Sequence, residues 1–229
     1  MKCMSHKIYN SYFWDDRIQT LKNRGISPLT VIDIGANVGQ WCSNFKKHFP
    51  NADVVSIEAN PQCEAELKSI NPNYLITLMG REINDDGVKF YINPDTNTDV
   101  GASIYRETTQ WGNNAVEITL PMITLDSLGK WFDWIKLDVQ GAELDVLMGG
   151  LETMKHAMVI ELELSVMRYN ENSPSASETI SWMWNSGFEL LDITEHIYIE
   201  ENDDGVHKLA QFNALFLNDK YLHMMDIKG

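Results

Sequence analysis

Three carboxylates follow short apolar segments of this sequence: Asp33 in VIDIGAN, Glu58 in VSIEAN and Asp138 in IKLDVQG. If these segments are neighbouring parallel strands, the side chains meet at the carboxyl edge of one sheet, where open α/β sheets bind their ligands. Carboxylates accept hydrogen bonds from ligand hydroxyl and amino groups, and they can accept a proton during a reaction. The sequence therefore predicts a binding crevice capable of acid–base chemistry.

Two glycines follow the first of these acids in the pattern DxGxNxG. Gly35 and Gly39 let the backbone turn tightly and let a ligand approach it, and the next helix would point its N-terminus at that ligand. The pattern is neither the GxGxxG of dinucleotide-binding enzymes nor the GxxxxGK[ST] of P-loop NTPases. The absence of a following Lys-Ser or Lys-Thr pair disfavours a phosphate cradle. The structural alternative is a glycine-rich turn with a capping aspartate.

Glu58 ends the next predicted strand, 25 residues after Asp33. An acidic side chain at this position can accept hydrogen bonds from both ribose hydroxyls of an adenosine-containing ligand. The alternative is an exposed carboxylate at a strand end. Because Asp33 and Glu58 share one rim of the predicted sheet, we favour the ribose interpretation.

Short apolar strands alternate with helices around these motifs. Strands are predicted at 30–34, 53–59 and 74–79, and helices are predicted between them at 39–49 and 61–70. This alternation is typical of a parallel sheet with helices on both faces.

A β-ribbon and a long polar loop interrupt the alternation at about 84–121. Strands are predicted at 88–92 and 115–121, and the residues between them are rich in Asn, Asp, Thr and Gly. The alternation resumes with a strand at 134–139. Further strands are predicted at 158–164, 188–193, 196–200 and 211–217, with an antiparallel strand closing the sheet.

The composition of the chain excludes several function classes. Of its 229 residues, 33 are acidic and 18 are basic, so the net charge is −15, which repels phosphate backbones and argues against general nucleic-acid binding. Three cysteines without a CxxC pair favour a reducing compartment over a disulfide framework or a zinc site. The sequence shows no signal-peptide run and no membrane span. We expect a cytoplasmic protein with one domain, 1–229, in which a helical segment at 1–29 precedes a core at 30–217.

The motifs, in this order, resemble the FkbM family of S-adenosylmethionine-dependent methyltransferases. The resemblance runs from about Thr30 to Leu217 and rests on VIDIGANVGQW, SIEANP, GASIYRE, ITLDSL, WIKLDVQGAELDVLMGG, GFELLDI and QFNALFL. It implies a Rossmann-like, seven-stranded methyltransferase sheet that is mostly parallel, with an antiparallel last strand and helices on both faces. It also implies S-adenosyl-L-methionine as the cofactor and O-methylation of a hydroxyl on a sugar, a glycan or a glycosylated natural product.

The resemblance also implies roles for individual residues. The turn at 33–39 would frame the methionine part of the cofactor, and Glu58 would hold its ribose. Gly80 and Arg81 would flank the adenine, and the loop 101–107 would lie near the cofactor. The expected cofactor residues are Asp33, Gly35, Ala36, Asn37, Gly39, Glu58, Ala59, Asn60, Gly80, Arg81, Ser103 and Asp138. No metal ligands are expected.

Methyl transfer to a hydroxyl requires alignment of the acceptor and removal of its proton. Asp138 is the first candidate for the base because it ends a predicted core strand, and Glu163 in ELELS is the second. Strand alternation puts Glu161 and Glu163 on one face, although a solvated pair of acids at a sheet edge is the alternative. His207 is the remaining candidate, because loops between late strands can cover an acceptor pocket. Glu143 fits either a role in the site or a favourable helix start.

Two other functions stay open at this point. A methyltransferase fold retained only for binding would not need an intact DxGxNxG turn and Glu58, and an NAD-dependent oxidoreductase would be expected to carry GxGxxG. The expected partner is a small-molecule or glycan hydroxyl acceptor. The sequence does not determine the oligomeric state.

Overall fold

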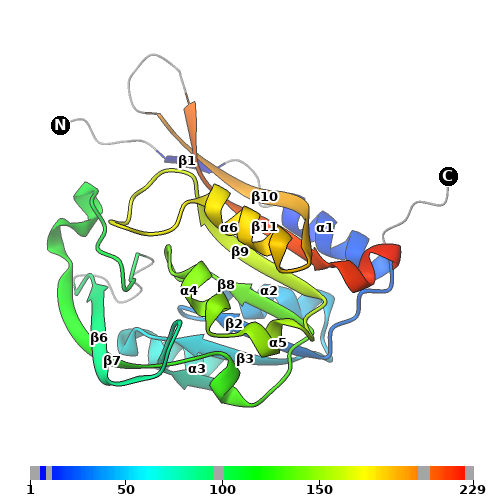
Figure 1. The fold of residues 1–229 in the computed structure, drawn as a ribbon, viewed down its shortest axis with the longest axis horizontal. Helices are drawn as coiled ribbons and strands as arrows, with labels where there is room; N and C mark the ends of the chain where they lie inside the picture. The colour runs from blue at the N-terminus through cyan, green and yellow to red at the C-terminus, as the bar shows by residue number, and fades with distance from the viewer. Residues whose placement is uncertain (1–5, 9–11, 95–100, 201–206, 225–229) are drawn as a thin grey trace.

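A mixed eight-stranded sheet forms the centre of the protein (Figure 1). The computed structural model describes residues 6–8, 12–94, 101–200 and 207–224. The strand order is β1-β10-β11-β9-β8-β2-β3-β4. These strands are β1 (His6–Ile8), β2 (Thr30–Ile34), β3 (Asp53–Glu58), β4 (Tyr74–Ile76), β8 (Trp134–Leu137), β9 (Val159–Ser165), β10 (Phe188–Glu200) and β11 (His207–Asn218).

Seven of these strands form the sheet that the sequence predicts. The strands β4, β3, β2, β8 and β9 are parallel neighbours, whereas β11 runs antiparallel to both β9 and β10. The predicted antiparallel last strand is therefore confirmed. β1 pairs antiparallel with β10 and adds an eighth strand at the edge of the sheet. The sequence did not predict β1, which lies inside the segment 1–29 that was expected to be helical.

A second, three-stranded sheet consists of β5 (Leu78–Met79), β7 (Val116–Ile123) and β6 (Asn84–Ile92). The antiparallel pair β6 and β7 is the ribbon expected at about 84–121. The strand expected at 74–79 is divided in the structure, because β4 pairs with β3 in the main sheet while β5 pairs with β7. The chain thus passes from the main sheet into the ribbon within six residues.

Helices cover both faces of the main sheet, as predicted (Figure 1). α1 and α2 pack on one face around an apolar core that contains Ile18, Phe45 and Trp134. α4, α5 and α6 close the opposite face over a core that contains Ile135 and Ile160. The helices are α1 (Tyr12–Asn23), α2 (Gln40–His48), α3 (Glu64–Ile70), α4 (Glu143–Met148), α5 (Leu151–Met154) and α6 (Ala176–Asn185), with short 3₁₀ turns at Pro61–Cys63, Gln110–Asn114, Asp126–Leu128 and Asp219–Met224. None of the helices described is long and apolar enough to cross a membrane.

The strand β10 is continuous where the sequence suggested two strands, 188–193 and 196–200. Its pairing with β11 shifts register between Thr194 and Ile197, and Glu195 adopts a φ of 50° at this point. The left-handed residue bends the strand without ending its pairing with β11.

Candidate active site

A row of charged side chains crosses the main sheet on the face that α1 and α2 cover. Strand pairing aligns Asp33 with Lys136 and Lys136 with Glu161. Two residues earlier on each strand, the corresponding row is apolar and consists of Val31, Trp134 and Val159. Because alternate residues of a strand share a face, the next row toward the carboxyl ends carries Asp138 and Glu163. The sheet therefore changes from apolar to charged along one face as it approaches the edge where the site was expected.

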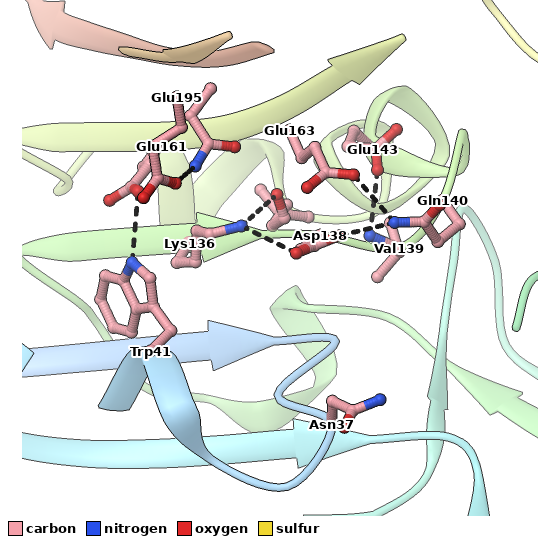
Figure 2. Close-up of polar contacts among 12 residues, drawn as sticks. Asn37, Trp41, Lys136, Asp138, Val139, Gln140, Glu143, Glu161, Glu163 and Glu195 are labelled. Carbon is pink, nitrogen blue, oxygen red and sulfur yellow. Dashed lines mark hydrogen bonds and ion pairs between the residues drawn. The ribbon is translucent and has the colours of Figure 1, made fainter. Parts of the chain in front are cut away.

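Lys136 is the one basic side chain among the buried residues of the described chain. Its Nζ lies 3.4 Å from Asp138 Oδ2 and 3.3 Å from the carbonyl oxygen of Leu137 (Figure 2). Burial lowers the pKa of Lys136, but the carboxylates of Asp138 and Glu161 raise it, and the net shift is upward. A charged ammonium group therefore lies among the carboxylates and stabilises their ionised forms.

Glu161 is fully buried, and three indole N–H groups donate to its carboxylate (Figure 2 shows Trp41). Trp14 Nε1 donates to Oε1 over 2.8 Å, and Trp41 Nε1 donates to the same oxygen over 3.2 Å. Trp134 Nε1 donates to Oε2 over 3.3 Å. Burial raises the pKa of Glu161 to about 7, although the charge of Lys136 and the indole donors counteract the rise. Glu161 thereby connects α1, α2 and β8 through one buried acceptor.

A side-chain amide joins the two carboxyl groups that the sequence nominates for catalysis. Gln140 Nε2 lies 2.9 Å from Asp138 Oδ1 and 2.9 Å from Glu163 Oε1 (Figure 2). Gln211 Nε2 donates to the same oxygen of Glu163 over 2.9 Å. Burial, followed by the charge of Asp138, raises the pKa of Glu163 to about 8. The Asp138 side chain is 33% exposed. The pair thus combines an accessible carboxylate with a neighbour that is largely protonated at neutral pH.

The turn after β2 uses left-handed backbone conformations. Gly35, Asn37 and Gly39 have φ angles of 80°, 49° and 90°, a region that suits glycine and tolerates asparagine. A Cβ on Gly35 would lie 1.8 Å from the carbonyl oxygen of Asp138, so the turn packs directly on the end of β8. Gly39 precedes α2, whose first turn has no side-chain cap. The first N–H groups of α2 can therefore donate to an anionic group of a ligand.

Glu58 ends β3, and both of its carboxylate oxygens accept main-chain hydrogen bonds. The N–H of Asn37 donates to Oε2 and the N–H of Asn60 donates to Oε1, each over 2.7 Å. Burial raises the pKa of Glu58, and the two N–H groups limit that rise. The side chain thus fixes the glycine turn to the end of β3. Each oxygen retains a lone pair that could accept from a ligand hydroxyl.

The buried groups at these strand ends fit S-adenosylmethionine, the expected cofactor. Asp33 Oδ2 and Asn60 Nδ2 are buried and have no hydrogen-bond partner among the residues described. Unpaired buried polar atoms are costly, so these two are the atoms that a ligand is expected to satisfy. Burial raises the pKa of Asp33 to about 7, against the opposing charge of Lys136. An excess of buried carboxyl groups over ammonium groups favours a ligand with positive charge, which the ammonium and sulfonium groups of this cofactor provide.

The segment expected to flank the adenine is attached to α4. Arg81 makes an ion pair with Asp145, with 2.9 Å between Nη2 and Oδ1, and the Tyr105 hydroxyl donates to Asp145 Oδ2 over 2.6 Å. A Cβ on Gly80 would lie 2.3 Å from Met122 Sδ. These contacts fix the position of the segment, and Asp145 was not identified from the sequence.

Ser103 connects the loop 101–107 to the turn after β8. It is buried, and its hydroxyl donates to the carbonyl oxygen of Gln140 over 2.8 Å and accepts from the N–H of Tyr105. The two remaining expected cofactor residues, Ala36 and Ala59, lie in the turns after β2 and β3. The structure therefore places the expected cofactor residues on neighbouring strand ends and on two loops held against them.

His207 lies apart from this group. It is the exposed first residue of β11, and β11 reaches β9 only four residues later, where Gln211 pairs with Ser165. Within the described part of the chain, His207 makes no hydrogen bond or ion pair with Asp138 or Glu163.

Glu143 supports the local backbone. It is buried at the start of α4, and its Oε1 accepts from the N–H of Val139 over 3.0 Å and from the N–H of Gly141 over 3.3 Å. Burial raises its pKa to about 7, although these N–H groups oppose the rise. This geometry favours the helix-start interpretation of Glu143.

Lys136 and Gln140 lie in the candidate site but were not among the site residues predicted from the sequence. The signal for Lys136 was present, because a lysine inside a buried apolar strand and two residues before Asp138 must share the face of that acid. The role of Gln140 depends on a long-range contact with Glu163 and has no local signal. Within the described ranges, no cluster of three or more His, Cys, Asp or Glu side chains is arranged to hold a metal ion.

Comparison with known proteins identifies the family of the chain and its fold. The family model described as "Methyltransferase FkbM domain" matches residues 33–190, whereas no curated protein sequence matches the chain significantly. A solved S-adenosylmethionine-dependent methyltransferase from Clostridium acetobutylicum ATCC 824 is similar with a TM-score of 0.50 and 9% identity, over 92% of each chain. Magnesium protoporphyrin IX methyltransferase from Synechocystis PCC 6803, solved with bound cofactor, has a TM-score of 0.49 and 11% identity, over 89% of this chain and 77% of its own. The likeness to the clostridial structure shows a shared Rossmann-like methyltransferase fold.

Proposed function

The chain belongs to the FkbM family of methyltransferases, and we propose that it transfers the methyl group of S-adenosylmethionine to a hydroxyl of a sugar, a glycan or a glycosylated natural product. The observation that carries this proposal is the paired arrangement of Asp138 and Glu163 at adjacent strand ends, joined through Gln140. A hydroxyl acceptor must lose its proton, and this pair offers a group to take it.

The cofactor supplies a methyl group that its sulfonium already activates, so the protein has to align the acceptor and manage one proton. In our proposal, Asp33 and the turn at 35–39 hold the methionine part of the cofactor. Glu58 holds its ribose, and Gly80 and Arg81 flank its adenine. The unpaired oxygen of Asp33 supports this assignment, because an ammonium group would satisfy it.

Asp138 and Glu163 take different roles in this proposal. Asp138 is the base, because its side chain is partly exposed and its Oδ2 lies 3.4 Å from the ammonium group of Lys136. Glu163 carries a proton at neutral pH, because burial and the charge of Asp138 raise its pKa to about 8. Its second oxygen, Oε2, makes no hydrogen bond within the described residues, so it can donate to the acceptor oxygen. Two neighbouring carboxyl groups in different environments typically divide the roles of base and donor in this way.

The experiment is a panel of sugars and glycosylated metabolites incubated with labelled S-adenosylmethionine and either wild type or Asp138→Asn. The substitution keeps the shape of the side chain and removes its charge, so turnover should fall by about 10²–10⁴-fold. Asp53→Asn is the matched control, because Asp53 is exposed at the opposite end of β3. It should retain wild-type turnover.

Three results would change the proposal. Methylation of amines and not of hydroxyls would contradict the acceptor class. Cofactor binding without transfer to any acceptor would favour a non-catalytic binding module. Loss of cofactor binding in Asp138→Asn would assign Asp138 to the cofactor site and leave Glu163 and His207 as the candidate bases.

A further inference from the structure

Gln140 occupies a conformation that its surroundings hold in place. It is a non-glycine residue with a φ of 53°, and such a conformation persists when neighbouring contacts fix it. Its carbonyl oxygen accepts from Ser103 Oγ over 2.8 Å and from Asn170 Nδ2 over 2.6 Å. Both donors are buried, and they come from two loops that pair with each other through Glu107 and Asn170. The backbone of Gln140 is therefore fixed independently of its side chain.

The side chain of Gln140 has the chemistry that a bridge between two carboxyl groups requires. A primary amide has two N–H donors on one nitrogen. Gln140 Nε2 lies 2.9 Å from an oxygen of Asp138 and 2.9 Å from an oxygen of Glu163, so each donor has one acceptor. The bridge is neutral, and it spans from the end of β8 to β9. A glutamate at 140 would bring a third carboxyl group in place of the two donors.

We propose that Gln140 is a positioning residue that sets the protonation of Glu163 by donating one hydrogen bond to each carboxyl group of the Asp138–Glu163 pair. This inference rests on the proposed function, because it concerns the same pair, and it adds the group that controls the pair. Without the bridge, Asp138 and Glu163 would each lose one hydrogen-bond donor. The ionised form of Glu163 would then be less stable, and Glu163 would hold its proton to higher pH. The bridge keeps the pKa of Glu163 close enough to neutral pH that this residue can exchange its proton under working conditions.

Other charged groups act on this pair from the surrounding elements, and the test must hold them constant. The charge of Lys136 on β8 opposes the rise in the pKa of Glu163, and the charge of Glu143 on α4 adds to it. Tyr169, in the loop after β9, is close enough to Glu163 for its own pKa to be raised by that charge, after the effect of burial. The other carboxyl groups that face Asp138 are Asp33, Glu58 and Glu195, on β2, β3 and β10.

The experiment is a titration that does not depend on an acceptor. The ¹³C carboxyl resonance of Glu163, assigned by its disappearance in Glu163→Gln, is followed against pH in wild type, Gln140→Met and Gln140→Glu. Methionine keeps the length of the side chain and removes both donors. The midpoint of Glu163 should rise by about one pH unit in Gln140→Met and by more in Gln140→Glu, because a lost donor and an added like charge both disfavour the ionised form. Gln19→Glu adds the same charge on the exposed face of α1 and should leave the midpoint unchanged.

Different experimental results would contradict the positioning role of Gln140 and the proposed function. An unchanged Glu163 midpoint in both Gln140 variants, with thermal midpoints near that of wild type, would overturn the positioning role whatever the enzyme methylates. Absence of methylation by wild type would contradict the proposed function and leave the titration result intact. Where an acceptor is found, the alkaline limb of the kcat profile against pH should move upward in Gln140→Glu, together with the Glu163 midpoint, because the proposed reaction uses the protonated form of Glu163.

Discussion

The backbone of Gly35 lies against the carbonyl oxygen of Asp138, so closely that a Cβ on Gly35 would be 1.8 Å from that oxygen. Gly35→Ala should therefore add a main-chain clash to the strain of about 1–2 kcal/mol that a side chain suffers in the left-handed region. In a chain of this size we expect the thermal midpoint to fall by more than about 5 °C. Calorimetric titration should show weaker binding of S-adenosylmethionine, because the turn that frames it is displaced.

Gly129→Ala is the matched control for this prediction. Gly129 also has a positive φ, of 60°, but a Cβ there would meet nothing within 4 Å. This variant should show the backbone strain alone, with unchanged cofactor affinity. If the two variants had equal thermal midpoints and equal affinities, the packing of the glycine turn on Asp138 would contribute nothing to stability or to cofactor binding.

Removal of the Glu58 carboxylate should weaken cofactor binding. A hydrogen bond to a charged group contributes about 1.5–3 kcal/mol, so Glu58→Ala should raise the dissociation constant of S-adenosylmethionine by roughly 10-fold or more. The thermal midpoint should also fall, because the N–H groups of Asn37 and Asn60 lose their acceptor. Glu64→Ala, at an exposed position in the first turn of α3, should change the affinity little. Wild-type affinity in a folded Glu58→Ala protein would exclude a ribose contact.

The hydrogen bond between Trp14 and Glu161 should contribute measurably to stability. Trp14→Phe keeps an aromatic ring and removes the N–H that donates over 2.8 Å, so urea denaturation should show a loss of about 2 kcal/mol. Trp131→Phe, at a side chain that is 53% exposed, should stay within about 0.5 kcal/mol of wild type. The double variant Trp14→Phe with Glu161→Gln should cost less than the sum of the single variants. Strict additivity would mean that the two side chains do not interact.

The stability of the cofactor-free protein should decrease as pH rises through neutrality. The pKa of Glu161 is 4.5 in its ordinary environment and about 7 in the folded protein, because it is buried. The folded state therefore holds this proton more tightly than the unfolded state, and the resulting stability is complete below about pH 4.5 and is lost as pH passes 7. Asp33 and Glu143 act in the same direction.

Thermal melts between pH 5.5 and 8.5, without cofactor, test this dependence. The midpoint should fall with rising pH in wild type and in Glu64→Gln, which alters an exposed carboxylate. The fall should be smaller in Glu161→Gln, which has no ionisation at this position. A wild-type midpoint that rises over this range would contradict the assignment.

The carboxyl edge of the sheet was predictable because each strand carries its own signal. Asp33, Glu58 and Asp138 directly end or follow apolar runs, and parallel strands bring such positions together whatever the remaining contacts are. Glu163 followed from alternation within a single strand. These inferences needed only local periodicity and the general topology of α/β sheets.

The contacts that complete the site could not be predicted in the same way. The bridge from Gln140 to Glu163 joins residues 23 positions apart, and nothing in the sequence near either residue specifies the partner. The division of 74–79 depends on β7, which pairs with its second half from more than 40 residues away. The sequence did not reveal that β10 is continuous, because the polar residues around Glu195 resemble a turn. In the structure, β10 pairs with β11 on both sides of these residues.

The contact between Trp14 and Glu161 joins residues 147 positions apart, and this separation constrains the order in which the protein folds during synthesis. A ribosome adding about 5–20 residues per second completes the acceptor roughly 7–30 s after the donor. Until β9 and β11 are available, Trp14 lacks its carboxylate acceptor, and the core that buries Trp14, Ile18 and Leu21 lacks Val159, Leu215 and Leu217. Helix α1 is thus synthesised early and completes its packing against the sheet late. During that interval its apolar face is incompletely covered, and transiently exposed apolar surface of this kind is what chaperones bind.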